Sequence, residues 1–577
     1  MDDCVLPDRS PWQARWLALA VALLVSAPAL APGHVLLGDL VSVPRLDLDL
    51  DALGLSGALP RAVPADGATA LLTALLPGAL VQKALLVATV YAAVLGAARL
   101  VPPGPGGRRG LAGAVAGLVY GWSPYLAERL LLGQWTLLLA WAALPWVARA
   151  GVRLRAGEPG ALPGLVLALV PAVLSPTGSL LAAGAVVAGT GRRGAGRALA
   201  AVALLSAPWV VAAVLSPAAG TSDPAGVAAF AARGENWGGP VLAVLGTGGL
   251  WNAAAVPPSR ASVLVPVVTA LLLALAVAGW AARAVRAGTG ARLLVLGAAG
   301  LLLALAGALP GASALLEAAV ATVPGAGLLR DGQKWAAWVA LPLAVGAGLG
   351  ARRAYAALRD LLPAPGARAV AALALLLPLV AVPDLAWGVG GRLQPVAWPA
   401  DWQAVREVLA DDDAPGDVLV LPAGVYRAFD WNDGRPQLDP AARWLPRPVV
   451  ADDTLRVDGE AVRGEDTRAR AVLAAAGDPA ELARLGVGWV LVERGTPGPE
   501  VPSAVAGLPV AFAGADLVLH RVPGAVEGPR PAAGRAAAVI AAHGLALGIA
   551  GASALWITVR ASTVALRRRP PEKRVTA

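Results

Sequence analysis

Long apolar segments, separated by short connections that are often rich in arginine, constrain the fold of this chain more than any other feature. An α-helix needs about 20 mostly apolar residues to cross a bilayer. Several of the runs are shorter, so their boundaries are approximate. The pattern predicts a mainly α, polytopic membrane protein with about 12 transmembrane helices. The runs occupy 11–32, 84–101, 111–122, 135–150, 162–175, 179–191, 198–215, 262–282, 293–310, 335–351, 368–387 and 536–559.

Two of these segments allow more than one interpretation. The first run is N-terminal and ends in small residues, as a signal peptide does. We interpret it as an uncleaved first span, because the arginine pattern farther along the chain needs a cytoplasmic start. The pair 162–191 is interrupted by Ser175 to Gly178. It forms either two short helices or a re-entrant hairpin, and the second alternative gives ten spans with the same orientation of the ends.

The composition agrees with a membrane protein and argues against other classes. Of the 577 residues, 57% are hydrophobic and 15% are charged, whereas soluble domains have about 25% charged residues. The net charge of +9 does not indicate nucleic-acid binding, because the arginines form short clusters between apolar runs. The single cysteine, Cys4, excludes an intrachain disulfide, and the three histidines are too scattered to indicate zinc. The sequence demands no cofactor, although its acids leave a divalent metal open.

The arginine clusters predict the orientation of the chain in the cytoplasmic membrane. Arg108 and Arg109, Arg192 and Arg193, and Arg352 and Arg353 lie in connections that alternate with others poorer in basic residues. Basic loops stay on the cytoplasmic side. We therefore expect the clusters and both termini, including the basic tail RRRPPEKR, in the cytoplasm. The first loop, Gly33 to Gly67, is then outside.

The region 389–534 departs from the transmembrane pattern. Charge rises, and the periodicity predicts helices at 401–411 and 478–486 and strands at 417–424, 489–495 and 515–522. Alternation of helix and strand is typical of an α/β domain, which the topology places outside. Three parts follow: a transmembrane region over 1–388, an extracytoplasmic α/β domain over 389–534, and a last span with a basic tail over 535–577.

The first outer loop contains five acids, of which Asp39 is nearest to the end of the first span. Apolar residues flank it in LLGDLV, and a partly desolvated carboxylate can act as a general base. A solvated linker explains the acids equally well for Asp39. For Asp47, Asp49 and Asp51 we favour the linker, because LDLDLD alternates as a short strand with one wet face does.

A second candidate is Tyr120 to Trp135, in which Glu128 and Arg129 lie between apolar segments. Charges at that depth cost a few kcal/mol unless they pair or line a wet cavity. We expect an amphipathic interfacial helix with Glu128 and Arg129 near one face and Gln134 one or two turns on, available to a substrate. The alternative is that the aromatic residues only anchor the helix at the interface.

Two further connections hold polar residues next to spans. The loop 217–261 contains Glu235 and Trp251, and its mixture of aromatic, amide and glycine residues is suited to sugar binding. We nevertheless expect an ordinary ordered loop there. In Leu328 to Trp338, the residues Arg330, Asp331 and Lys334 precede a late span on the outer side. The inside-positive bias does not explain cations there, and they could hold a lipid phosphate. Snorkelling of long side chains is the alternative.

These segments together resemble a known family. The outer loop with GD, then PYLAERL and GQW, then LLRDGQKW before a late span, is similar to the membrane glycosyltransferases of the C-type fold. Actinobacterial arabinofuranosyltransferase D-like proteins and YfhO-like membrane proteins are the nearest in layout. The segment DPAELARLGVGWVLVERG is also similar to the helix–strand unit in the outer domain of YfhO-like chains.

The resemblance implies an enzyme that moves a sugar from a polyprenyl-phosphate donor to a cell-envelope glycan or lipid acceptor outside the membrane. It also implies Asp39 as the base and Arg129, Arg330 and Lys334 as ligands of the lipid phosphate. We expect an inverting transfer, in which the acceptor hydroxyl loses its proton to Asp39. Two alternatives are a transporter of lipid-linked glycans, against which the apolar spans argue, and a noncatalytic assembly protein.

Overall fold

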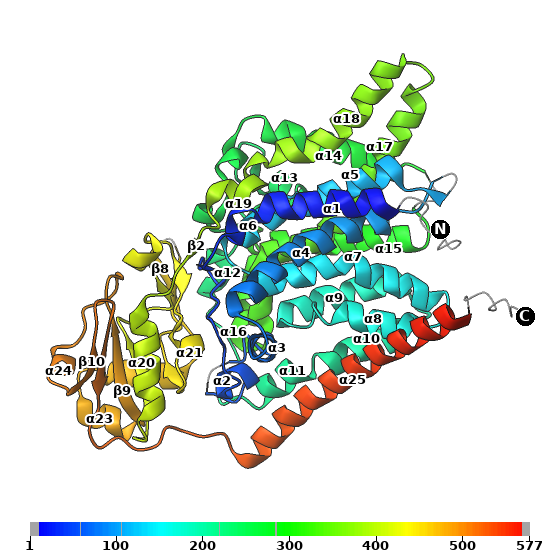
Figure 1. The fold of residues 1–577 in the computed structure, drawn as a ribbon. Helices are drawn as coiled ribbons and strands as arrows, with labels where there is room; N and C mark the ends of the chain where they lie inside the picture. The colour runs from blue at the N-terminus through cyan, green and yellow to red at the C-terminus, as the bar shows by residue number, and fades with distance from the viewer. Residues whose placement is uncertain are drawn as a thin grey trace, which may run out of the picture.

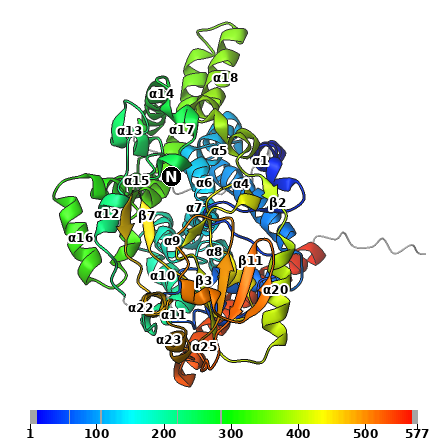
Figure 2. The ribbon, with the colours of Figure 1, turned by 90° about the vertical axis from the view of Figure 1, so that its left-hand side faces the viewer.

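A computed structural model describes residues 11–567, apart from 58, 105–106, 219, 283–285 and 458. Cys4 and most of the predicted cytoplasmic tail lie outside the described residues. Figure 1 shows a bundle of helices, with a smaller part built on a β-sheet at one end of it. Figure 2 looks onto that end, where the strands lie in front of the bundle. Helix α1 begins, and α25 ends, at the opposite end of the bundle (Figure 1).

Every predicted apolar run overlaps at least one helix of the bundle. Ala, Leu and Val dominate these segments; Ala and Leu are strong helix formers, and apolar side chains can face either other helices or lipid. The helices of the runs are α1 (Pro11–Ser26), α4 (Gly78–Leu100), α5 (Gly110–Gly121), α7 (Trp135–Arg155), α8 (Ala161–Leu169), α9 (Pro176–Thr190), α10 (Ala195–Leu205), α11 (Ala207–Val214), α14 (Val265–Trp280), α15 (Thr289–Leu305), α17 (Ala336–Leu358), α18 (Ala364–Ala381) and α25 (Ala533–Arg567).

Six described helical segments are long and apolar enough to cross a membrane, which confirms the predicted membrane class. The bent pair of α10 and α11 makes a seventh if its two helices are one span. The predicted total of about 12 stays a prediction, because other runs form shorter helices. The pair 162–191 forms two separate helices, α8 and α9. The six segments are Gly78–Leu100, Trp135–Arg155, Thr289–Ala308, Gly332–Leu358, Ala364–Ala381 and Ala533–Thr563.

Helix α17 is the central helix of the bundle. In the most apolar stretch of the segment that contains α17, 89% of the residues are buried. The corresponding share for α25, which lies on the outside of the bundle, is 17%. Small residues let α14 approach α17 closely: a Cβ added to Gly279 would clash with the carbonyl oxygen of Gly346. The short helix before α17, η7 (Gly332–Trp335), packs closely on α15, because a Cβ added to Gly332 would clash with the carbonyl oxygen of Ala304.

The sheet has five strands in the order β10-β11-β9-β3-β6. Strand β3 is parallel to both of its neighbours, and the other pairs are antiparallel. Alternate residues of β3 face opposite sides, as a strand requires: Val418 and Val420 pack with Trp402 of α20, and Leu419 and Leu421 pack with Leu482 of α23. The strands are β3 (Asp417–Leu421), β6 (Val449–Val450), β9 (Val487–Glu493), β10 (Val510–Ala513) and β11 (Leu517–Arg521). The helices are α20 (Ala400–Asp411), α22 (Thr467–Ala474), α23 (Pro479–Arg484) and α24 (Ser503–Ala506).

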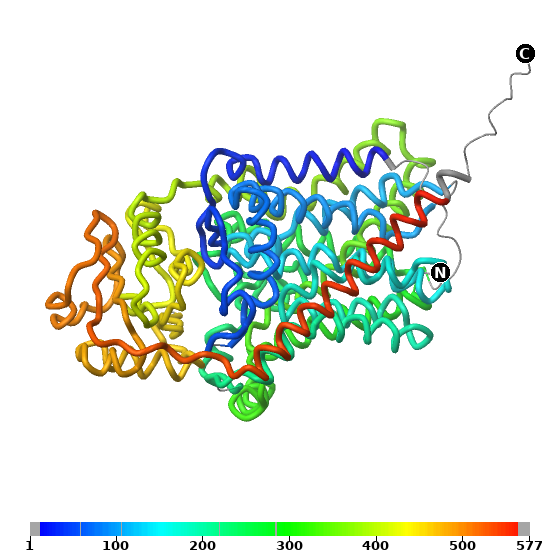
Figure 3. Tube along the Cα trace, turned by 60° about the horizontal axis from the view of Figure 1, so that its bottom comes forward, coloured from blue at the N-terminus to red at the C-terminus, as the bar shows by residue number. Residues whose placement is uncertain are grey.

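The first loop lies between the bundle and the sheet, where it contacts both (Figures 1 and 3). Strand β1 (His34–Val35) pairs with β2 (Pro395–Val396), just before the sheet begins. The predicted strand in LDLDLD does not form. Instead, Asp49 caps helix α2 (Leu50–Leu53) by accepting from the amide of Ala52 at 2.8 Å. Short Asp side chains favour such caps over strands.

The predicted interfacial helix is also different in the structure. Helix α6 (Pro124–Leu131) forms where it was expected, with the Ser123 hydroxyl accepting from the Leu126 amide. All eight of its residues are buried. The helix is therefore packed inside the protein, and its charged residues find partners there instead of facing a membrane surface.

Candidate functional site

Asp39 lies in a tight turn that joins the two parts of the protein. Its backbone amide donates to the carbonyl oxygen of Leu132, at the end of α6, at 2.9 Å. The amide of the preceding Gly38 donates to Pro436 at 2.8 Å, and the carbonyl of Gly38 accepts from Leu438 at 2.8 Å. The turn is therefore fixed from the bundle and from the α/β domain at once.

The carboxylate of Asp39 has polar partners on several elements. The Tyr426 hydroxyl donates to its Oδ1 atom, and the Gln134 side chain also hydrogen-bonds to it. Burial raises the pKa of Asp39 above its ordinary value, and Tyr426, Lys334 and Arg443 partly oppose that rise. A carboxylate whose pKa is raised is a better proton acceptor, which suits a general base.

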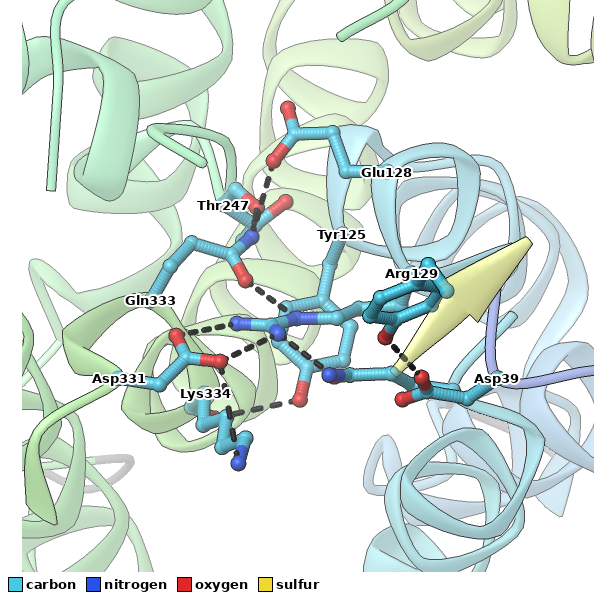
Figure 4. Close-up of polar contacts among 10 residues, drawn as sticks. Asp39, Tyr125, Glu128, Arg129, Thr247, Asp331, Gln333 and Lys334 are labelled. Atoms are coloured by element: carbon cyan, nitrogen blue, oxygen red, sulfur yellow. Dashed lines mark hydrogen bonds and ion pairs between the residues drawn. The ribbon is translucent and has the colours of Figure 1, made fainter. Parts of the chain in front are cut away.

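Arg129 connects this carboxylate, through Gln134, to the segment of η7 that precedes α17. Its guanidinium forms a bidentate ion pair with Asp331, with nitrogen–oxygen distances of 2.8 and 2.9 Å (Figure 4). It also donates to Gln134 at 2.7 Å and to Gln333 at 2.7 Å. The side chain is fully buried, so these contacts hold Gln134 and Asp331 in place. The geometry favours a positioning role for Arg129 over direct contact with a lipid phosphate.

Glu128 lies deeper, on the far side of Gln333. The Gln333 amide donates to Glu128 at 3.1 Å and to the carbonyl of Thr247 at 3.2 Å. Burial, and then the charge of Glu235, raise the pKa of Glu128 well above its ordinary range. Glu235 is itself paired with Arg260 at 2.6 Å. Glu128 is completely buried and is not accessible to a substrate. It contacts the site through Gln333.

Lys334 and Arg330, predicted as a cationic pair, face different surroundings. The Lys334 ammonium lies 3.8 Å from Asp331 and its side chain is 22% exposed, so it is available near Asp39. Arg330 instead lies 3.6 Å from Glu465 and over the ring of Phe230. Burial, and then the charge of Arg61, lower the pKa of Arg330 to about 10. Arg330 is thus separate from the contacts that surround Asp39.

A largely apolar groove is lined in part by Leu40, the residue that follows Asp39. One face of α4 lines it at helical spacing, from Gly78 to Val90, a length of about 18 Å. Arg443 of α21 (Ala441–Trp444) and its partner Asp66, 3.1 Å away, also line the groove. The lining residues are Leu40, Val41, Ser42, Val43, Leu46, Asp66, Thr69, Thr73, Gly78, Val81, Gln82, Leu85, Leu86, Thr89, Val90, Leu130, Trp135, Leu138, Leu139 and Arg443.

Sequence reasoning missed Tyr426 and Arg443, which reach the site from the α/β domain. Nothing in their local sequence marks them, because they lie hundreds of residues from Asp39. Glu235 was noted only as part of an ordinary loop, yet its carboxylate neighbours Glu128. Among the described residues no group of three or more His, Cys, Asp or Glu could hold a metal ion, so no residue is assigned as a metal ligand. The expectation that no cofactor is needed stays a prediction.

No protein-family model matches the chain, and no curated protein matches it. Solved structures do match the chain. The cryo-EM structure of arabinofuranosyltransferase AftD from mycobacteria matches with a TM-score of 0.56 and 19% identity, over 92% of this chain and 41% of that one. The chain has an AftD-like fold. A variant of the same enzyme matches with a TM-score of 0.55 and 18% identity, over 91% of this chain and 42% of that one.

The AftD-like fold confirms the resemblance predicted from the outer-loop segments. The chain spans about two fifths of the length of the AftD structures. At this identity the likeness shows the fold, and the roles of individual residues rest on the geometry of the site itself.

Proposed function

We propose that this protein is a membrane glycosyltransferase that transfers a sugar from a polyprenyl-phosphate donor to a cell-envelope glycan or lipid acceptor. The reaction takes place at the outer face of the cytoplasmic membrane. One observation carries the proposal: Asp39, a half-buried carboxylate that feels the positive charges of Lys334 and Arg443, directly precedes Leu40, which lines a largely apolar groove. The AftD-like fold agrees with it.

The groove suits the lipid part of the donor. A polyprenyl chain needs an apolar path, and the groove follows α4 from its start at the sheet end into the bundle. The phosphate then lies near Asp39, where Arg443, which lines the groove, and Lys334, which acts on the charge of Asp39, can offset its charge. The Nη1 atom of Arg443 is buried and has no hydrogen-bond partner among the described residues, so the protein leaves one donor of this guanidinium unused.

The reaction follows from this arrangement. The acceptor hydroxyl gives its proton to Asp39, on the Oδ2 atom that Tyr426 leaves open, while its oxygen bonds to the anomeric carbon. The bond between that carbon and the phosphate oxygen breaks, and its electron pair leaves with the polyprenyl phosphate. Attack opposite to the leaving group inverts the anomeric configuration. Lys334 and Arg443 stabilise the charge that develops on the phosphate.

The orientation of the molecule supports a site on the outer face. Helix α1 begins and α25 ends at the end of the bundle away from the sheet, and the connection between α17 and α18, with Arg359, is at that end too (Figure 1). If that basic end is cytoplasmic, the groove opens outside. The site is at the end of the bundle and not midway along it, which favours a transferase over a transporter.

The decisive experiment is the Asp39→Asn variant, purified in detergent and assayed with polyprenyl-phosphate-linked arabinofuranose, the sugar class in the name of AftD. We expect a loss of transfer of 100-fold or more, on the order of a lost general base. Asp47→Asn is the control, because Asp47 is in the same loop but pairs with Arg406. Full activity of Asp39→Asn would overturn the proposal.

A second set of variants tests the phosphate contacts. We expect Lys334→Ala and Arg443→Ala each to raise KM for the donor about 10-fold, the size of one charge-assisted hydrogen bond. Arg330→Ala is the matched control, because Arg330 contacts Glu465 and Phe230 instead. If Arg330→Ala raises KM and the other two do not, the phosphate lies elsewhere.

A further inference from the structure

The α/β domain reaches into the site through a short strand. Strand β4 (Tyr426–Arg427) pairs with β5 (Gln437–Leu438), and β5 is bridged to Gly38 through Gln437. These contacts form one hydrogen-bonded ladder from β4 to the turn of Asp39. At its end the Tyr426 hydroxyl donates to Asp39, 387 residues away along the chain. The ladder fixes the distance between the two side chains, because backbone hydrogen bonds set its register.

The next residue, Arg427, fixes β4 from the other side. Its side chain is 1% exposed and pairs with Asp439 at 2.6 Å and with Glu493 at the end of β9. It also donates to the carbonyl of Gly424 at 2.6 Å. Successive side chains of a strand point in opposite directions. Arg427 therefore secures the strand to the sheet, while Tyr426 faces Asp39.

We propose that Tyr426 is a positioning residue of the transferase, so that the α/β domain completes the catalytic centre of the membrane domain. This inference rests on the proposed function. The Tyr426 hydroxyl holds the Oδ1 atom of Asp39 and leaves Oδ2 to take the proton of the acceptor hydroxyl. The α/β domain is thus part of the active site, in addition to any contact that it makes with a glycan.

The hydrogen bond also stabilises the charged form of Asp39 in a site where burial opposes it. The Gln134 side chain also hydrogen-bonds to Asp39. Three charged groups act on the same carboxylate or on its partner: Lys334 from η7 and Arg443 from α21 act on Asp39, and Arg61 acts on Tyr426. All three are cations and remain when the hydroxyl is removed. Loss of the hydroxyl therefore raises the pKa of Asp39, which leaves less of the base deprotonated at a given acid pH.

The test is Tyr426→Phe, which keeps the ring and removes only the hydroxyl, compared with Tyr355→Phe at the far end of α17. We expect kcat to fall about 10-fold, KM for the donor to change less than twofold, and the acid limb of the pH–rate profile to move up by about one pH unit. A variant that only loosens the fold lowers the melting temperature without moving the acid limb, so the melting temperature is measured alongside.

The outcomes distinguish a failure of this inference from a failure of the proposed function. If Asp39→Asn is inactive and Tyr426→Phe has the wild-type kcat and acid limb, Tyr426 does not position the base, and the proposed function stands. If Asp39→Asn is fully active, the proposed function fails first. If Tyr426→Phe melts early with an unmoved acid limb, the role of Tyr426 is structural and the inference is wrong.

Discussion

Arg129 of α6 and Asp331, the residue before η7, form a bidentate ion pair with distances of 2.8 and 2.9 Å across 202 residues of sequence. Both side chains are buried. In such a place a carboxylate and a guanidinium stabilise each other only as long as both are present, because either one alone is an uncompensated charge. The pair therefore joins the segment that holds Gln134 to the segment that holds Lys334.

Asp331→Ala should destabilise the protein by about 3–5 kcal/mol, because it leaves the buried Arg129 without its partner. Thermal unfolding in detergent measures this. Glu481→Ala is the control: it removes the partner of Arg484, whose side chain is 72% exposed, and exposed pairs of that kind contribute little to stability. Equal melting temperatures for Asp331→Ala and the wild type would contradict a structural role for the pair.

Gly133→Ala should abolish activity and lower stability. Gly133 has a φ of 72°, and a Cβ there would clash with the backbone of Leu37 and of Asp39 itself. Backbone atoms cannot move aside as a flexible side chain can, so the Asp39 turn has to shift. Gly164→Ala in α8 is the control, because a Cβ at Gly164 meets nothing within 4 Å. It should be neutral or slightly stabilising. An active Gly133→Ala variant would show that the turn tolerates displacement.

Stability should depend on pH through Asp51. Burial raises the pKa of Asp51 from 3.8 to about 6 in the folded protein. In the unfolded chain the pKa is the lower one, so between the two values the folded state binds more protons, and stability falls as the pH rises through that window. Asp51→Asn stays neutral and should therefore melt at a higher temperature than the wild type at pH 7.5. At pH 4 the difference should shrink; a constant difference would show that Asp51 is not the titrating group.

Filling the groove should block long donors first. Leu85→Trp places a large ring in the apolar part of the groove, away from the polar groups that surround Asp39. We expect KM for a long polyprenyl donor to rise on the order of 10-fold or more, and a donor with a short, water-soluble prenyl chain to be used as before. Ala84→Trp adds the same ring to an exposed part of α4 and should leave both donors unaffected. Equal losses with both donors would place the lipid elsewhere.

Local sequence was enough to predict several parts of this structure. The apolar runs give the helices of the bundle, because the periods of hydrophobic residues depend only on neighbours in sequence. The same holds for α20, β3, α23, β9 and β11, which lie where alternation predicts them. The strand predicted in LDLDLD does not form, because Asp49 caps helix α2 instead.

Sequence and tertiary structure also determined different features of the candidate site. Asp39, Glu128, Arg129, Gln134, Asp331 and Lys334 could be chosen from sequence because a charged or polar side chain next to an apolar span is costly unless it pairs or lines a wet cavity. The sequence alone determined that these residues are unusual for their surroundings. Only the tertiary structure decided which of them meet: it separated Arg330 from Lys334, buried Arg129 against Asp331, and brought Tyr426 and Arg443 to Asp39. The reason is physical, since contacts across hundreds of residues depend on how helices and strands pack and leave no mark on the local pattern.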